Sequence, residues 1–220
     1  MGCDADIEQI RHKDYLFDSS TLLESIKKGN SHLFLELPSM PTPPSNNSVD
    51  NVFWNIEDNL LVGKTFFKDA LGESQDGWNL SRIDTNLPCE FNNNRESWIN
   101  FSYFKDNMDP SDRLVHVVYI TPNENNIDDE ESEYFIAAEN WKPIDVNNLK
   151  IPLEGALLIA ERAGGTDFRT KYKNDCFIRI QFWADDSEFG NSWRFIYEPL
   201  SDKKSDQFEI YVNSNNGQIH

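Results

Sequence analysis

The cysteines and histidines are the residues of this chain whose chemistry could define an active or metal site. They are Cys3, Cys89, Cys176, His12, His32, His116 and His220. The sequence contains no HExxH, CxxC or GxSxG motif, and neither Cys89 nor Cys176 lies in a known nucleophile signature. Two histidines flank predicted strands and one is the last residue, so a three-histidine metal site would need elements that lie apart. The sequence therefore predicts no catalytic residue, no metal site and no cofactor.

Other patterns that could carry chemistry are incomplete. The segment LVGKT at 61–65 lacks the first glycine of a phosphate-binding loop. The acidic segment NENNIDDEESE at 123–133 lacks the ligand spacing and the glycine of a calcium loop, which favours a solvated loop over a metal site. Pairs of carboxylates for acid and base catalysis are available everywhere in a chain with 38 Asp and Glu residues. Their abundance makes any single pair uninformative.

Charge and hydropathy limit the partners that the chain can have. The formal net charge of −18 repels phosphate backbones and anionic lipid heads, and no stripe of Lys and Arg overrules it. This argues against nucleic acid as a partner. No apolar run approaches the roughly 18 to 20 residues that a transmembrane helix needs. The composition is that of a polar globular protein whose aromatic residues supply much of the core.

The three cysteines raise the question of the cellular compartment. Gly2 and Cys3 match the end of a bacterial lipobox, in which the cysteine would carry a lipid anchor, but the preceding apolar part is absent and chance placement is the alternative. If the protein is exported, Cys89 and Cys176 can form a disulfide; if it is cytosolic, they are ordinary thiols. We favour an extracytoplasmic, lipid-anchored protein over a cytoplasmic one.

The first half of the chain predicts an N-terminal arm followed by a helix and strands. Residues 1–50 form the arm, with a short helix capped near Ser19 or Ser20 and ended by Gly29, a strand at 32–37, and a proline-rich linker. Apolar spacing predicts a helix at 53–71, interrupted or bent near Gly63. Alternating residues predict strands at 77–84, 97–104 and 113–122.

The second half predicts the same order. A helix beginning at Pro152 has Leu153, Ala156, Leu157 and Ala160 on one face, and Gly164 with Gly165 supplies its C-cap. Alternation predicts strands at 175–183, 192–199 and 206–219, the last closing on an Asn-Asn-Gly turn. The fold class expected is α+β, with one module at 51–140, a second at 141–220, and the joint near 134–150.

The order of helix, double glycine and strands resembles a PepSY-like module, in which a helix packs across a small antiparallel sheet, as in cystatin-like folds. The motifs that carry the resemblance are WRFIY at 193–197, similar to the family's W.V.Y pattern, and NSNNGQI at 213–219, similar to its closing turn. The match covers about the last 70 residues. An earlier stretch looks like a diverged copy with Trp98 in the place of Trp193, although it lacks a double glycine.

Tandem modules of this kind resemble those of bacterial extracytoplasmic and lipid-anchored proteins, and the resemblance implies a non-enzymatic binding or regulatory role. The ligand would be a peptide or protein segment held by a sheet face or by an edge strand. The candidate binding aromatics are Phe101, Tyr103, Trp183 and Trp193, most of which we expect in the core. The alternative is a small carboxylate-dependent hydrolase with a cleft between the modules.

Overall fold

The computed structural model describes residues 9–18, 20–36, 56–70, 72, 77–90, 98–105, 114–133, 141–184, 189–200 and 206–220, and the structural statements below concern these residues. The strands are β1 (Gln9–Leu16), β2 (Leu35–Glu36), β3 (Trp78–Pro88), β4 (Trp98–Lys105), β5 (Leu114–Thr121), β6 (Asn126–Glu133), β7 (Cys176–Trp183), β8 (Ser192–Pro199) and β9 (Phe208–Asn213). The helices are α1 (Leu22–Lys27), α2 (Ile56–Asp69), α3 (Leu153–Ala160) and α4 (Thr166–Lys171).

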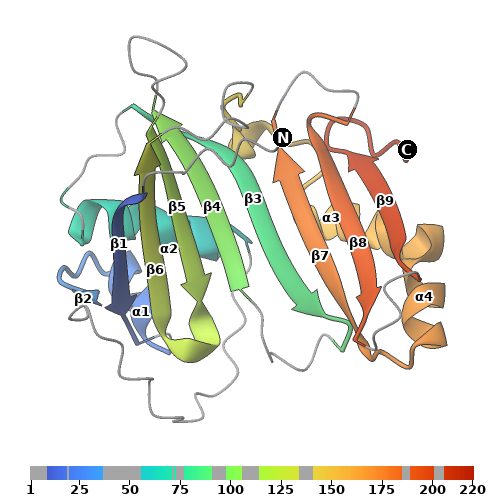
Figure 1. The fold of residues 1–220 in the computed structure, drawn as a ribbon, viewed down its shortest axis with the longest axis horizontal. Coiled ribbons are helices and arrows are strands. Elements are labelled where there is room, and N and C mark those ends of the chain that lie inside the picture. Colours follow the sequence, from blue (N-terminus) through green and yellow to red (C-terminus); the bar gives the residue numbers. More distant parts are fainter. Residues whose placement is uncertain are drawn as a thin grey trace, which may run out of the picture.

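The strands form one antiparallel sheet in the order β2-β1-β6-β5-β4-β3-β7-β8-β9. This corrects the expectation of two separate helix-on-sheet modules. The reason is the long strand β3, which pairs with β4 along one edge and with β7 along the other, so that the two predicted sheets share a continuous ladder. Figure 1 shows β3 and β7 side by side in the middle of the sheet.

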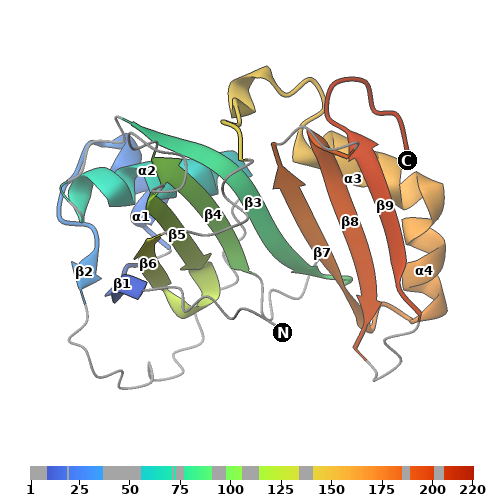
Figure 2. The same ribbon diagram turned by 45° about the horizontal axis from the view of Figure 1, so that its top comes forward.

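The helices cover a single face of the sheet, as Figures 1 and 2 show from two directions. On that face the alternating residues of each strand are buried, for example Ile180 and Phe182 on β7 and Phe195 on β8. Trp193 packs against Phe182 with ring centroids 4.7 Å apart, and its indole donates a hydrogen bond to the Ile151 carbonyl at 3.0 Å. The opposite face carries no helix among the described elements.

The N-terminal arm belongs to the sheet. β1 pairs with the whole length of β6, whereas we expected residues 1–50 to be less regular. The predicted short helix is confirmed as α1, and the predicted strand at 32–37 is reduced to the two residues of β2. The proline-rich stretch at 38–51 lies outside the described residues.

The acidic segment is a strand, which corrects the expectation of a solvated loop. β6 lies between β1 and β5 and pairs with both. Its alternation places Ile127 and Asp129 on the helix-covered face, fully buried, and Asp128 and Glu130 on the helix-free face. Pairing on both edges satisfies the backbone, and this outweighs the low strand propensity of its carboxylates.

Helix α2 runs without a break through Gly63, so an interruption there, one of the two predicted alternatives, is wrong. A Cβ atom built at Gly63 would lie 3.4 Å from the Tyr103 hydroxyl and 3.6 Å from the Phe101 ring. The glycine therefore allows the helix to lie close to the sheet.

The double glycine lies where one helix ends and the next begins, as predicted for the end of the helix. Gly164 has a φ of 137°, which kinks the chain within the segment Glu161–Gly165, and α4 begins directly afterwards. A Cβ built at Gly165 would lie 2.3 Å from the Tyr197 hydroxyl. The chain therefore turns at the glycines and starts a new helix, because the missing side chains let it pass close to β8.

We predict opposite effects for two glycine substitutions in this region. Gly165→Ala should destabilise the protein by about 2 kcal/mol, because the new methyl group collides with Tyr197. Gly155→Ala is the matched control: its Cβ would meet only Ile151 and Pro152, at 3.6 and 3.7 Å. Because alanine favours a helix by about 1 kcal/mol over glycine, Gly155→Ala should stabilise. Urea unfolding measures both, and equal effects would contradict the proposed close approach.

The structure joins Cys89 and Cys176 in a disulfide, with their Cα atoms 5.3 Å apart. Cys89 follows the last residue of β3 and Cys176 is the first residue of β7, and the Cys89 amide donates to the Cys176 carbonyl at 2.9 Å. Both residues are buried. The bond closes a separation of 87 residues at one end of the β3–β7 pair. Cys3 lies outside the described residues, so its role as a lipid anchor stays a prediction.

Thiol titration of the unfolded, unreduced protein tests this bond. For protein made in an oxidising compartment we expect one free thiol per chain, from Cys3. Reduction should lower the free energy of unfolding by about 4 kcal/mol, the loss expected in the chain-entropy model for a loop of this length. Three free thiols would contradict the pairing.

Candidate functional site

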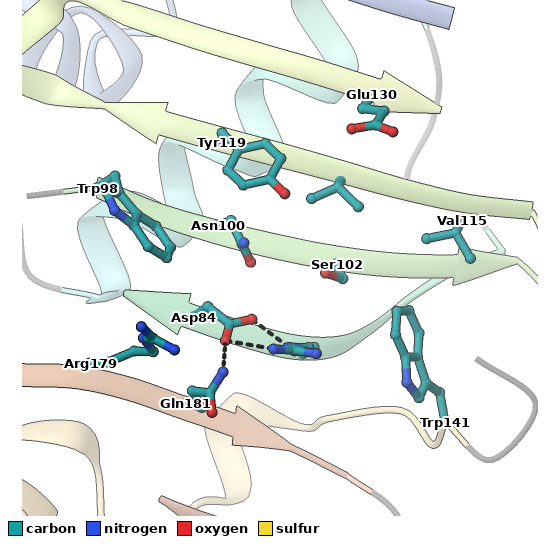
Figure 3. A pocket seen from close by; sticks show the side chains of 12 residues that line it. Asp84, Trp98, Asn100, Ser102, Val115, Tyr119, Glu130, Trp141, Arg179 and Gln181 are labelled. Atoms are coloured by element: carbon teal, nitrogen blue, oxygen red, sulfur yellow. Dashed lines mark hydrogen bonds and ion pairs between the residues drawn. The ribbon is translucent and has the colours of Figure 1, made fainter. Parts of the chain in front are cut away.

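A pocket of about 460 Å³ lies on the helix-free face of the sheet, over strands β3 to β7. Its floor consists of four buried polar side chains: Asp84, Asn100, Ser102 and Gln181. Half-buried aromatic side chains stand around the floor: Trp98, Tyr119 and Trp141. Figure 3 shows Glu130 and Tyr119 on one side of the floor and Arg179 and Gln181 on the other.

Strand register brings the floor residues together. Tyr119 pairs with Asn100, Asn100 with Asp84, and Asp84 with Gln181, so these side chains form one row across four strands. Gln181 pairs in turn with Arg194, which continues the row onto β8. Side chains of directly opposed residues lie on the same face and interact, so the row is a direct product of the sheet order.

A β-bulge directs Arg82 into the pocket. The register of β3 against β4 shifts between Leu80 and Arg82, which leaves Ser81 as the extra residue. Simple alternation would place Arg82 on the same face as Leu80, which packs against the core. The bulge resets the alternation, so Arg82 and Asp84 lie together on the helix-free face.

An ion-pair and amide network fixes the β3–β7–β8 side of the floor. The Arg82 guanidinium donates to both Asp84 carboxylate oxygens, at 2.5 and 2.9 Å, and this bond raises the pKa of Arg82. The Gln181 amide donates to Asp84 at 2.6 Å, and its oxygen accepts a bond from Arg194 at 2.9 Å. Arg194 also pairs with Glu209. The amide of Gln181 is thus held in one orientation, with both ends occupied.

On its β4 side the floor has a hydrogen-bond acceptor without a donor among the described residues, and we call this the open side of the pocket. Asn100 is only 9% exposed, and its side-chain oxygen makes no hydrogen bond to any described residue. A buried acceptor without a donor costs roughly 1 to 3 kcal/mol, and this loss is recovered when a ligand or a water supplies the donor. Figure 3 shows Asn100 at the centre of the floor, between Tyr119 and Asp84.

The electrostatic environment of Tyr119, on this open side, is negative. Burial is the main cause that raises the pKa of its hydroxyl, and the charges of Glu130, Asp128 and Asp84 raise it further. Arg82 acts in the opposite direction as the smallest cause. Three carboxylates against one guanidinium therefore favour positive charge near Tyr119.

A chain segment outside the strands supplies Trp141. The Lys142 amide donates to the Ala184 carbonyl at 2.9 Å, and the Ile144 amide donates to the Leu80 carbonyl at 2.7 Å. These two bonds fasten the segment to the ends of β7 and β3. Ile144 enters the core and Trp141 lines the pocket.

The predicted binding aromatics lie mostly elsewhere. Phe101, Tyr103 and Trp193 are buried under the helices on the other face of the sheet. Trp183 lies on the helix-free face, where its ring contacts Tyr211 at 6.4 Å, outside the pocket lining. Trp98 lines the pocket and Trp193 is in the core, so the two tryptophans that we expected to be equivalent occupy opposite faces.

The histidines do not gather in the part of the chain that the structure describes. His116 forms a buried pair with Asp129 between α2 and the sheet, with its ring against Phe67 at 4.7 Å. His32 and His220 are exposed, and the side chain of His12 lies outside the described residues. Among the described residues no group of three metal-binding side chains occurs.

The sequence did not predict the polar pocket residues, because strand alternation served as a signal for the core alone. The polar positions of the same strands carried a signal: Arg82 and Asp84 in SRID, and Asn100 and Ser102 in NFS, occupy the positions opposite to the apolar ones. The sequence could not show that Gln181 lies beside these residues, since its hydrogen bond to Asp84 spans 97 residues of sequence.

Comparison with known proteins gave no match to a family model, to a curated protein or to a solved structure. The resemblance to PepSY-like modules therefore rests on the sequence motifs alone and stays a prediction. In the described part of the chain, no helix has the length and apolar character needed to cross a membrane.

Two buried tyrosines provide a matched pair of predictions. The Tyr103 hydroxyl is buried without a hydrogen-bond partner among the described residues, whereas the Tyr197 hydroxyl donates to Glu161 at 2.9 Å. Tyr103→Phe should therefore raise the free energy of unfolding by about 1 kcal/mol, and Tyr197→Phe should lower it by about 1.5 kcal/mol. Denaturant melts at neutral pH measure both changes, and a loss in both variants would show that Tyr103 has a partner.

The same pair predicts a pH dependence. Burial raises the pKa of both hydroxyls. In the unfolded chain the two hydroxyls ionise at about pH 10. Because they ionise less readily in the folded protein, the free energy of unfolding is unaffected by them below that pH and falls as the pH rises above it. Tyr103→Phe should reduce this alkaline loss.

Proposed function

We propose that this protein is a non-enzymatic binding protein that holds a segment of a peptide or protein partner in the pocket on its helix-free sheet face. The observation that supports it most is the Asn100 oxygen, a buried acceptor at the centre of the floor that has no donor among the described residues. The aromatic side chains around the floor add apolar contact area. Pockets of about 300 to 1,000 Å³ with apolar walls and a few convergent polar groups are typical of ligand sites.

The helix-free face of the sheet is a better candidate for the binding site than either edge strand. The outer side of β9 is partly occupied, because Val212 bridges to Ile219 and Tyr211 exchanges backbone hydrogen bonds with His220. At the other edge β2 has only two residues and pairs with Tyr15 and Leu16 of β1. The helix-free face carries the pocket with its aromatic and polar side chains, so we place the partner on the face.

The alternative of a carboxylate-dependent hydrolase receives less support from the geometry. The pocket lining contains two carboxylates, Asp84 and Glu130. Both carboxylate oxygens of Asp84 accept hydrogen bonds from Arg82, and one of them also accepts a bond from the Gln181 amide. A general acid and a general base must both exchange protons, and Asp84 is not placed to do so. The cleft between modules on which the alternative relied is replaced by a continuous sheet.

The proposal is tested by adding a pool of mixed-sequence peptides to isotope-labelled protein and recording the indole N–H signals by NMR. We expect the signals of Trp98 and Trp141 to shift. Trp193 is an internal control, because its indole is buried and bonded to Ile151 and should not move.

Variants complete the test. Trp98→Ala and Trp141→Ala should each weaken binding of the selected peptides about tenfold or more, the loss of roughly 1.4 kcal/mol or more that a binding aromatic supplies. Leu158→Ala is the control, since Leu158 is exposed on the helix-covered side. Unshifted indole signals of Trp98 and Trp141, or affinities unchanged in both tryptophan variants, would refute a site on the face.

A further inference from the structure

The chemistry of the open side of the pocket indicates which group of the partner it receives. We propose that the pocket binds an arginine side chain presented by a basic peptide or protein surface. This inference rests on the proposed binding function and specifies its ligand.

Hydrogen-bonding capacity is the first argument. The open side offers acceptors: the Asn100 oxygen, the Glu130 carboxylate and the oxygen of the Tyr119 hydroxyl. A guanidinium carries five N–H donors in a rigid plane and no acceptor. It can therefore satisfy several of these oxygens at once, which a ligand rich in acceptors cannot do.

Charge is the second argument. The row that contains Asn100 and Tyr119 continues through Asp128 on β6 to Asp14 on β1, and Glu130 lies one alternation further along β6 on the same face. Carboxylates thus gather on the β1–β6 side of the pocket. A positive ligand group is attracted to this side, and an anionic group is repelled by it.

The two arginines of the lining do not reverse this preference. Arg82 is neutralised by Asp84, with which it makes two bonds. Arg179 is paired with Glu198 at 2.9 Å. Both lie toward β3 and β7, on the far side of the floor from Glu130, as Figure 3 shows for Arg179. The paired arginines of the lining therefore lie on one side of the floor, and Glu130 lies on the other.

The aromatic residues are the third argument, and they favour arginine over lysine. Trp98, Tyr119 and Trp141 lie around the floor. A planar guanidinium stacks on aromatic faces and keeps its N–H groups free for in-plane bonds, whereas an ammonium acts as a hydrated point charge. The net charge of −18 would in addition speed the approach of a basic partner.

The test uses three small probes that share one backbone: the N-acetyl methylamides of arginine, citrulline and lysine. Citrulline keeps the shape of arginine but loses its charge. By NMR titration of the Trp98 and Trp141 indole signals, we expect arginine to bind with a Kd of roughly 1 mM and citrulline to bind at least about tenfold more weakly. The affinity of the lysine probe should lie between those of the other two.

Two charge-matched variants separate local from overall charge. Glu130→Gln should weaken binding of the arginine probe about fivefold, because it removes a carboxylate beside the ligand. Glu124→Gln makes the same charge change at an exposed site outside the pocket and should leave affinity within about twofold.

The outcomes distinguish the two proposals. If citrulline binds as well as arginine, or if Glu124→Gln weakens binding as much as Glu130→Gln, the arginine inference is wrong. If mixed peptides still shift Trp98 and Trp141 in that case, the binding function stands with another ligand group. If neither the peptides nor the arginine probe shifts these signals, both proposals fail.

Discussion

The pairing of β3 with β7 is the constraint on which the rest of the structure depends. Without it the chain would consist of two separate sheets, each covered by its own helices. The pair brings Asp84 beside Gln181 and so completes the hydrogen-bond network of the pocket floor. It also sets Cys89 next to Cys176 at one end of the ladder. Fold, disulfide and candidate site are therefore consequences of one register.

The two sides of the pocket differ in how completely their polar groups are hydrogen-bonded. On the β3–β7–β8 side every charged group of the row has a partner, and the amide of Gln181 is occupied at both ends. On the β4 side a buried oxygen of Asn100 lacks a donor among the described residues. Buried polar groups are normally satisfied, so this asymmetry separates the scaffold of the floor from the part that is free to contact a ligand.

Local patterns in the sequence predicted most of the individual elements but not their assembly. Apolar spacing located α2 and α3, and alternation located β3, β4, β5, β7 and β8, because burial of one face determines both patterns. β6 was missed, since its carboxylates conceal a strand whose neighbours are 110 residues or more away on one side. The single sheet and the row from Tyr119 to Gln181 were beyond prediction for the same reason: strand register between distant segments leaves no local trace.

The separation in sequence between β3 and β7 has a consequence for when the pocket forms during folding. The hairpins β4–β5, β5–β6, β7–β8 and β8–β9 join neighbours in the chain, whereas Asp84 and Gln181 are 97 residues apart. Contacts between distant residues carry the larger loop-closure entropy and form late. The pocket straddles the β3–β7 pair, so an incompletely folded chain can contain all of these hairpins and still lack the pocket.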